Sequence, residues 1–320
     1  MTARVEIKNL YKTYFRHQWL LSAGEAVPVL QNVSLTLPEN RVLGLVGESG
    51  CGKSTLCKVL LGIEKPTSGT VLVNGQDMSN ATSQTLKKLR RQMQVVYQDP
   101  YSSLDPRMTV RQLLAEPLDI HGLYADKTSR ETFLKQLLTS VGLSETYLDR
   151  YPHEFSGGQR QRICIARALA LDPQILVADE PVSALDVSVQ AQILNLLRDI
   201  KRARKLSMIF VTHDFAVARF LCDDIAVMYK GRIVEMAPAE ELFARPLHPY
   251  TQALLSAVPQ VGRPLARPLA EPGVAAPAGC VFAPRCAQVT ALCRQKEPVF
   301  KAAAPDHFCA CVQLTQGETK

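Results

Sequence analysis

The sequence predicts an α/β fold with a mainly parallel core sheet, because short apolar strands alternate with helical segments. Three runs carry this prediction: RVLGLVG from Arg41, QILVAD from Gln174 and SMIFVTH from Ser207. Each run is apolar along its length and bounded by polar or turn-forming residues, which is typical of strands buried on both faces. One helical pattern follows the first run and another separates the other two, so we expect helices on both faces of the sheet.

Other segments predict parts that surround this sheet. Strand-like alternation opens the chain in VEIKNL from Val5 and returns in NVSLTL from Asn32. Residues from about 105 to 172 have helical patterns and lack strand runs, which predicts a helical subdomain inserted into the sheet domain. Six prolines between residues 259 and 284 resist regular structure. We therefore place a domain boundary near residue 260, between a main domain over 1–260 and an extension over 261–320.

Composition predicts a folded protein that is made and kept in the cytoplasm. A hydrophobic share of 47% is ordinary for a globular chain. The net charge of +7 comes without a basic run of five or more residues, so nucleic acid is not an expected partner. No stretch of about eighteen uncharged apolar residues is present, and the charges of Arg4, Glu6 and Lys8 interrupt any signal-peptide core.

The most specific motif is GESGCGKS at residues 47–54, which matches a phosphate-binding loop between a strand and a helix. Glycines let backbone amides converge on phosphates, Lys53 brings a positive charge to the β and γ phosphates, and Ser54 offers a hydroxyl to magnesium. The sequence therefore predicts binding of ATP with Mg²⁺. The predicted nucleotide contacts in this segment are Gly47, Glu48, Ser49, Gly50, Cys51, Gly52, Lys53, Ser54 and Thr55.

Two further motifs fit the same chemistry. ILVADE at residues 175–180 is an apolar strand that ends in Asp179, placed to hold magnesium, and Glu180, placed to polarise the attacking water. The alternative for this pair, an acidic turn after a buried strand, is disfavoured by the upstream loop. FSGGQRQRICIARAL from Phe155 places a serine and two glycines at a helix start, which is either a second anion site or simply a capped helix.

The motifs together resemble the ATPases of ABC transporters. The phosphate loop, FSGGQ, ILVADE, SALD at residues 183–186 and VTHD at residues 211–214 occur in the order of that family and span most of residues 1–260. The resemblance implies a P-loop NTPase fold of the ABC ATPase type, with an antiparallel β part and an inserted helical subdomain. It also implies ATP hydrolysis.

The resemblance assigns roles to residues that chemistry alone leaves open. It implies that Gln98 in VYQDP senses the γ-phosphate side and faces membrane subunits, that His213 contacts the γ-phosphate, and that Asp186 communicates across an ATPase dimer. Tyr14 is the expected aromatic that stacks on adenine, although Phe15 is adjacent. Glu180, His213 and Gln98 are the expected catalytic residues, Ser54, Gln98 and Asp179 the expected Mg²⁺ ligands, and Ser156, Gly157, Gly158 and Gln159 the signature that contacts nucleotide.

Two segments narrow the resemblance to one branch of the family. QDPYSSLDPRMTV from Gln98 and RPLHPYTQALLSAVP from Arg245 resemble the ATPases of bacterial dipeptide, oligopeptide and nickel importers. YPHEFSGG and EPVSALDVSVQAQ resemble the F-type subunit of peptide systems. That likeness implies a homologous D-type ATPase, two permeases and an external binding protein as partners, at the cytoplasmic face of the inner membrane. Import of nickel or another solute, and a soluble ABC ATPase acting on ribosomes or DNA, are the alternatives.

Five of the nine cysteines crowd into the last part of the chain, at positions 280, 286, 293, 309 and 311. Their spacing lacks the close pairs of zinc ribbons, and on spacing alone an iron–sulfur cluster, zinc or incidental thiols remain open. GCVFAPRC resembles the tail of peptide-importer ATPases, where a [4Fe–4S] cluster accompanies such cysteines. A His four positions before the last cysteine in that pattern selects His307 and Cys311. The resemblance therefore implies Cys280, Cys286, Cys293 and Cys311 as ligands, with Zn²⁺ as the alternative metal, while spacing alone leaves Cys309 open as the fourth ligand.

Overall fold

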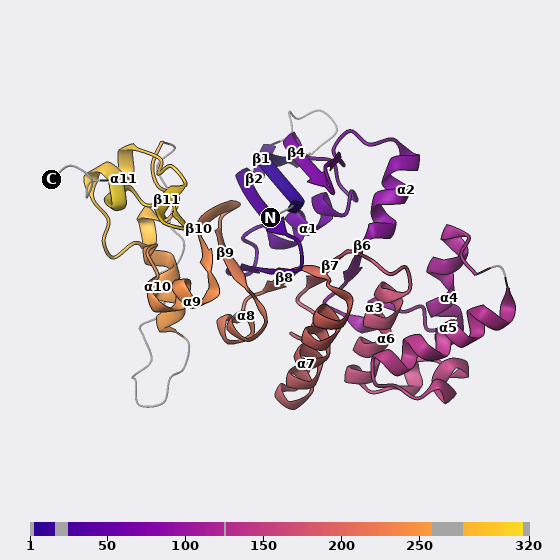
Figure 1. The fold of residues 1–320 in the computed structure, drawn as a ribbon. Coiled ribbons are helices and arrows are strands. Elements are labelled where there is room, and N and C mark those ends of the chain that lie inside the picture. Colours follow the sequence, from indigo (N-terminus) through magenta and orange to yellow (C-terminus); the bar gives the residue numbers. More distant parts are fainter. Residues whose placement is uncertain (1–2, 17–24, 125, 258–277, 316–320) are drawn as a thin grey trace.

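A computed structural model describes residues 3–16, 25–124, 126–257 and 278–315, and its core is an eight-stranded mixed sheet (Figure 1). The strand order is β11-β12-β10-β9-β3-β8-β7-β6. Neighbouring strands from β9 through β3, β8 and β7 to β6 are parallel, whereas β9, β10, β12 and β11 pair antiparallel. The predicted α/β fold with a mainly parallel core is confirmed. The strands are β3 (Val42–Val46), β6 (Met93–Val96), β7 (Ile175–Asp179), β8 (Ser207–Thr212), β9 (Asp224–Tyr229), β10 (Arg232–Pro238), β11 (Lys301–Ala304) and β12 (His307–Cys309).

Apart from polar residues at their ends, the central strands are apolar, because they supply side chains to cores on both faces of the sheet. In β3, Val42 and Val46 belong to one hydrophobic core, whereas Leu43 and Leu45 belong to the other. All of β3 and β8 is buried. When successive side chains of a strand enter two cores in turn, neither face of the strand is polar, so its sequence is a continuous apolar run.

A second, four-stranded sheet of order β2-β1-β4-β5 covers one face, and its strand pairs are antiparallel. Leu10 of β1 and Leu56 of helix α1 are fully buried in the core that this sheet shares with β3. The antiparallel part implied by the resemblance is therefore present. Its elements are β1 (Ala3–Arg16), β2 (Glu25–Pro38), β4 (Ser68–Val73) and β5 (Gln76–Asp77), with α1 (Lys53–Leu60) and α2 (Ser83–Gln92) beside them.

Helices gather beyond β6 and on the other face of the core sheet (Figure 1). Local signals fix their ends: Thr109 and Gln112 form a capping box at the start of α4, and Gly122 ends it in the left-handed conformation. Among the described residues, no helix is both long and apolar enough to cross a bilayer. These elements are α3 (Pro100–Ser103), α4 (Val110–His121), α5 (Lys127–Ser140), the 3-10 helices η1 (Glu145–Asp149) and η2 (Pro152–Glu154), α6 (Gly157–Leu169), α7 (Val187–Arg204) and α8 (Phe215–Leu221).

The C-terminal part is joined to the core sheet by β12, which pairs with β10. Glu235 on β10 is fully buried and accepts hydrogen bonds from the backbone N–H groups of Leu247 and His248, while His307 Nε2 lies 2.8 Å from its carboxylate. The predicted boundary near residue 260 lies outside the described residues. The remaining elements are α9 (Ala239–Ala244), α10 (Pro249–Ser256), η3 (Ala283–Arg285), α11 (Ala291–Gln295) and η4 (Val312–Thr315).

Candidate functional site

The register of the parallel strands brings the motifs to one edge of the sheet. Val46 at the end of β3 is paired with Thr212 at the end of β8, and Asp179 at the end of β7 is paired with Val211. The segments that follow β3, β7 and β8 therefore leave the sheet at the same edge. This is the carboxyl edge, where open α/β sheets bind ligands.

The phosphate loop connects β3 to α1, and its glycines are required by geometry. Gly50 and Gly52 have φ values of 76° and 113°, which L side chains rarely adopt. A Cβ at position 47 would lie 2.2 Å from the carbonyl oxygen of Met228. The loop thus ends directly at the N-terminus of α1, where unpaired N–H groups favour an anion.

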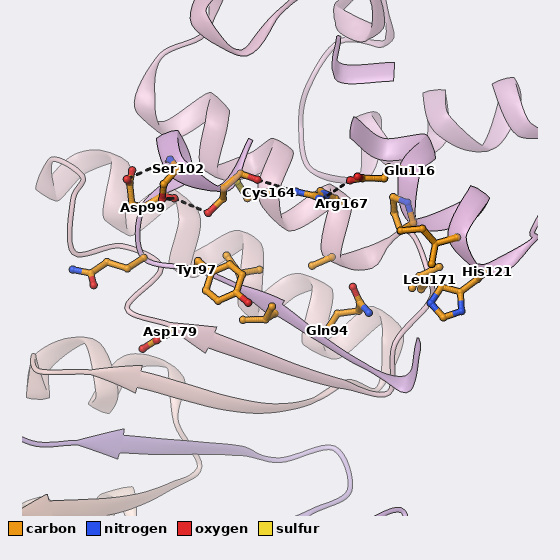
Figure 2. Close-up of a pocket in the computed structure, with 17 residues that line it drawn as sticks. Gln94, Tyr97, Asp99, Ser102, Glu116, His121, Cys164, Arg167, Leu171 and Asp179 are labelled. Carbon is orange, nitrogen blue, oxygen red and sulfur yellow. Dashed lines mark hydrogen bonds and ion pairs between the residues drawn. The ribbon is translucent and has the colours of Figure 1, made fainter. Parts of the chain in front are cut away.

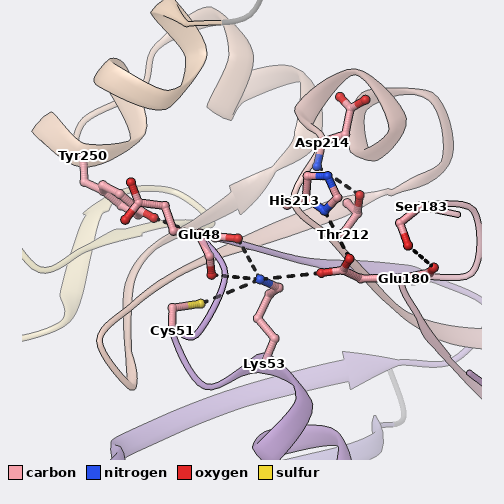
Figure 3. Close-up of polar contacts among 10 residues, drawn as sticks. Glu48, Cys51, Lys53, Glu180, Ser183, Thr212, His213, Asp214 and Tyr250 are labelled. Carbon is pink, nitrogen blue, oxygen red and sulfur yellow. Dashed lines mark hydrogen bonds and ion pairs between the residues drawn. The ribbon is translucent and has the colours of Figure 1, made fainter. Parts of the chain in front are cut away.

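Lys53 is the first residue of α1, and its ammonium group lies inside the loop (Figure 3). The side chain is buried, and Nζ donates to the carbonyl oxygens of Gly47 and Glu48 at 2.7 and 3.0 Å. Glu180 Oε1 is 3.9 Å from the same nitrogen. A buried cation held mainly by neutral carbonyls can exchange them for phosphate oxygens.

Asp179 and Ser54 form an oxygen-rich pair that fits magnesium. A hydrogen bond from Ser54 stabilises the ionised Asp179, yet burial and the neighbouring charge of Glu180 raise the pKa of Asp179 overall. A hydroxyl and a carboxylate are the donor types that Mg²⁺ prefers, and a bound cation would offset the cost of keeping this carboxylate ionised. These residues therefore suit the predicted metal.

Glu180 stands beside Lys53 in an unusual backbone conformation. Its φ of 47° is in the left-handed region, which non-glycine residues seldom occupy, and its N–H donates to Val211 O at 3.1 Å. His213 Nδ1 lies 3.2 Å from Glu180 Oε2 (Figure 3). Both side chains line a cavity of about 420 Å³ together with Gly47, Glu48, Ser49 and Leu254.

Gln98 lines a different cavity, of about 650 Å³, between β6 and the helices (Figure 2). Asp179 also lines it, so the magnesium candidate lies on this cavity, while Glu180 and His213 line the other one. On the helical side Arg167 donates to Glu116 at 2.6 Å and to Ser103 O at 2.8 Å. The cavity therefore joins the sheet edge to α4 and α6.

Tyr14 lies on β1 close to the start of α1. Its hydroxyl donates a hydrogen bond to the Glu64 carboxylate. Burial is the largest cause of the raised pKa of Tyr14, and a hydrogen bond with Thr55 acts in the opposite direction. Lys12 Nζ lies 4.8 Å from the ring centre. Phe15, the adjacent aromatic, is 64% exposed. The structure thus places Tyr14, rather than Phe15, in contact with the helix that follows the phosphate loop.

The signature residues are placed apart from both cavities. Ser156 is the N-cap of α6 and forms a capping box with Gln159, so these two side chains bond to each other's backbone. A Cβ at Gly158 would lie 2.5 Å from Val189 of α7, which packs the signature against the helix that follows Asp186. Neither cavity at the sheet edge is lined by the signature.

The four selected cysteines share one neighbourhood. Cys280 N donates to Cys293 O at 2.7 Å, and burial, followed by the charges of Cys293 and Cys311, raises the pKa values of Cys280 and Cys286. In the described part of the chain, however, no group of three His, Cys, Asp or Glu side chains is arranged to hold a single ion. His307 lies against Glu235.

Sequence reasoning missed two residues that hold the phosphate loop. Tyr250 Oη accepts a hydrogen bond from Glu48 N at 3.0 Å, and Arg285 binds the Glu48 carboxylate through two nitrogens. Tyr250 lies in RPLHPY, which was used only to narrow the family branch, and Arg285 lies in GCVFAPRC, which was used only for its cysteines. No periodicity or spacing connects either segment with residue 48.

Two family models match the chain. Residues 30–183 match the model described as ABC transporter, and residues 234–293 match the one described as the C-terminal region of oligopeptide/dipeptide transporters. Oligopeptide transport ATP-binding protein AppF of Bacillus subtilis is 46% identical over 295 residues, which are 89% of each chain. A putative peptide import ATP-binding protein of Brucella ovis is 45% identical over 318 residues, or 98% of each.

Solved structures agree with this similarity. A dimeric ATP-binding cassette in a post-hydrolysis state, bound to ADP and Pi, has a TM-score of 0.65 and 31% identity, covering 73% of this chain and 98% of its own. CbiO1 from Clostridium perfringens, part of an ABC transporter complex, has a TM-score of 0.66 and 26% identity, covering 77% and 92%.

Replacing Asp179 with Asn should stabilise the protein when magnesium is absent. A raised pKa in the folded state means that ionised Asp179 destabilises the fold, so the stability of the wild type falls as pH rises through that pKa. We expect the Mg²⁺-free variant to unfold about 2 °C higher at neutral pH, and the difference to vanish below about pH 3.9. Thermal unfolding measured across this range is the test.

The matched control is Asp172→Asn, whose carboxylate is exposed in an ion pair with Arg204. It should leave the unfolding temperature nearly unchanged. Addition of Mg²⁺ with nucleotide should then stabilise the wild type more than Asp179→Asn. A variant that is less stable than the wild type without Mg²⁺ at neutral pH would contradict this account of the site.

Proposed function

Because this chain belongs to the ABC transporter family, and hydrolyses ATP as a transporter ATPase, we propose that it energises import of di- and oligopeptides. The observation that carries the ATPase assignment is the grouping of the phosphate loop, Asp179, Glu180 and His213 at one sheet edge. The match of residues 234–293 to the oligopeptide/dipeptide transporter region supports the peptide substrate. Import of nickel or another solute is the alternative.

In the proposed mechanism the loop amides and Lys53 bind the phosphates. Ser54, Asp179 and Gln98 would hold Mg²⁺, which supplies positive charge to the β and γ phosphates when bound. Glu180 is placed to accept a proton at a carboxylate oxygen from the water that attacks the γ-phosphorus, while ADP leaves. His213 Nδ1 is already near Glu180, which leaves its other ring nitrogen for the γ-phosphate. Tyr14 would stack on adenine.

The nucleotide site is proposed to be completed by a second ATPase. Ser156 to Gln159 line neither cavity at the sheet edge, although they present a helix N-terminus that favours anions. The related cassette at 31% identity is a dimer in its solved structure. We propose that this signature and Asp186 face the phosphate loop of a partner, the homologous D-type subunit. ATP would then close the pair and hydrolysis would reopen it.

The cavity lined by Gln98 is proposed to receive a permease. Residues of β6, α4 and α6 line this cavity, so a permease bound there would contact both the core sheet and the helices. Large, partly exposed apolar side chains line it: Tyr97 and Ile120 are 43% and 58% exposed. Two permeases, supplied by an external binding protein, would hold the chain at the cytoplasmic face of the inner membrane.

The cysteines at 280, 286, 293 and 311 are proposed to bind a [4Fe–4S] cluster, with Zn²⁺ as the alternative. The proposal is supported by the mutual electrostatic influence of these thiols and by the close approach of Cys280 and Cys293. A cluster separates its thiolate ligands more widely than a single ion does, because iron and sulfide lie between them. Cys309, buried on β12 beside Glu235, is left out of the ligand set.

Glu180→Gln should lower ATP turnover at least about 100-fold, because a general base contributes this much or more. Nucleotide binding should remain, since the amide keeps the size of the side chain. Phosphate release by the assembled transporter, together with a nucleotide-binding titration, measures both. The control Glu145→Gln removes an exposed carboxylate of the helical layer. Undiminished turnover in Glu180→Gln would remove Glu180 from the catalytic role.

Ile120→Asp should reduce co-purification with permeases from detergent-solubilised membranes. The change places a charge in an apolar surface that a partner would bury, while the ATP-binding edge is untouched. Mass spectrometry of the captured companions and peptide uptake are the measurements. Val299→Asp changes an apolar side chain that is 65% exposed in the C-terminal part and serves as the control. Companions that are ribosomal or DNA-bound, with no permease, would reject the transporter assignment.

Cys286→Ser should remove iron and acid-labile sulfide, or zinc, from anaerobically purified protein. Elemental analysis and visible absorption distinguish the two metals. Cys309→Ser is the matched control, because it changes a thiol of the same segment outside the ligand set and should leave the metal content unchanged. Equal metal content in Cys286→Ser and wild type would reject the ligand assignment.

A further inference from the structure

Glu48, the second residue of the phosphate loop, is held through every polar group that it has. Its carboxylate accepts two hydrogen bonds from Arg285, at 2.7 and 2.9 Å. Its backbone N–H donates to Tyr250 Oη at 3.0 Å, and its carbonyl oxygen accepts from Lys53 Nζ at 3.0 Å (Figure 3). Two of these three partners lie in the C-terminal part of the chain.

Arg285 is a rigid partner. Its side chain is 5% exposed, and it ends the short helix η3, between Cys280 and Cys286. Phe282, at the start of the same turn, is 1% exposed and packs on Tyr250 with ring centres 5.4 Å apart. The same ring lies 5.3 Å from Tyr229. Since aromatic packing fixes the turn, the guanidinium is presented to the loop in one geometry.

The ion pair between Arg285 and Glu48 neutralises a charge that would oppose phosphate binding. Glu48 places a negative charge in a loop whose amides bind a polyphosphate, and its side chain is 36% exposed, so solvent screens it only in part. A bidentate guanidinium neutralises the carboxylate and fixes its direction more effectively than a lysine would. Without that partner, the carboxylate would repel the phosphates and be free to turn toward them.

We propose that Arg285 is a positioning residue of the ATP site, which neutralises Glu48 and holds it away from the phosphates. The proposal rests on the proposed function in one respect, namely that this loop binds ATP. It makes the segment around Cys280 and Cys286 a part of the nucleotide site, joined to it by a side chain 237 residues away along the sequence.

The test is the affinity of the full-length chain for ATP, titrated with a fluorescent ATP analogue and Mg²⁺. Arg285→Gln should weaken binding about tenfold, as expected for one uncompensated charge near the phosphates. Removing the carboxylate as well, in Arg285→Gln with Glu48→Gln, should restore the affinity to within about twofold of wild type. A merely structural contact would not be rescued by a second deletion.

Arg41→Gln is the matched control. Arg41 makes the same bidentate contact, with Asp224 at 2.7 and 2.8 Å, but at the opposite end of β3 from the loop. Its loss should lower the unfolding temperature and leave ATP affinity unchanged. Arg285→Lys, which keeps the charge, should bind within about threefold of wild type and remains informative if Arg285→Gln does not fold.

The outcomes separate this proposal from the proposed function. A wild type that binds no ATP would reject the function itself. A wild type that binds ATP, with Arg285→Gln binding equally well, would overturn only the role of Arg285. A double variant as weak as Arg285→Gln would overturn neutralisation, as would an Arg285→Lys protein that is folded but binds tenfold more weakly.

Discussion

The parallel register of β3, β7 and β8 is the constraint on which the site depends. These strands end level with one another, so Asp179, Glu180 and His213 each lie at a strand end or one residue beyond it, beside the loop that follows β3. Asp179 ends β7 and His213 follows β8. A one-residue slip of β7 would turn Asp179 to the other face of the sheet, away from Ser54. Burial of both faces of β3 and β8 resists such a slip.

The same constraint explains why much of the fold could be predicted from sequence. A strand that is buried on both faces is a continuous apolar run, and its end is marked where the run meets a motif. QILVAD and SMIFVTH therefore indicated core strands, and ILVADE indicated the carboxylates at the end of one of them. Alternation in VEIKNL and NVSLTL indicated strands outside the core, and helical patterns indicated the helical subdomain, whereas the antiparallel arrangement came from the family resemblance.

Contacts between single residues far apart in sequence could not be predicted. Glu48 meets Arg285 across 237 positions, and Glu235 meets His307 across 72. Neither pair leaves a periodic pattern, because each depends on how the last strands fold back onto β10. His307 entered the sequence analysis only as a marker for Cys311. In the structure its ring lies with a buried carboxylate that also binds two backbone N–H groups.

Charge balance explains why the loop needs partners from so many segments. Three carboxylates, of Glu48, Asp179 and Glu180, stand near two cations, Lys53 and Arg285, and one negative charge is left where an anion must bind. Arg285 neutralises the Glu48 carboxylate, so the remaining excess of negative charge lies at Asp179 and Glu180. A divalent cation offsets it only there, beside the Ser54 hydroxyl. Lys53 is bound more closely by loop carbonyls than by Glu180, so its transfer to phosphate breaks neutral hydrogen bonds and no short ion pair.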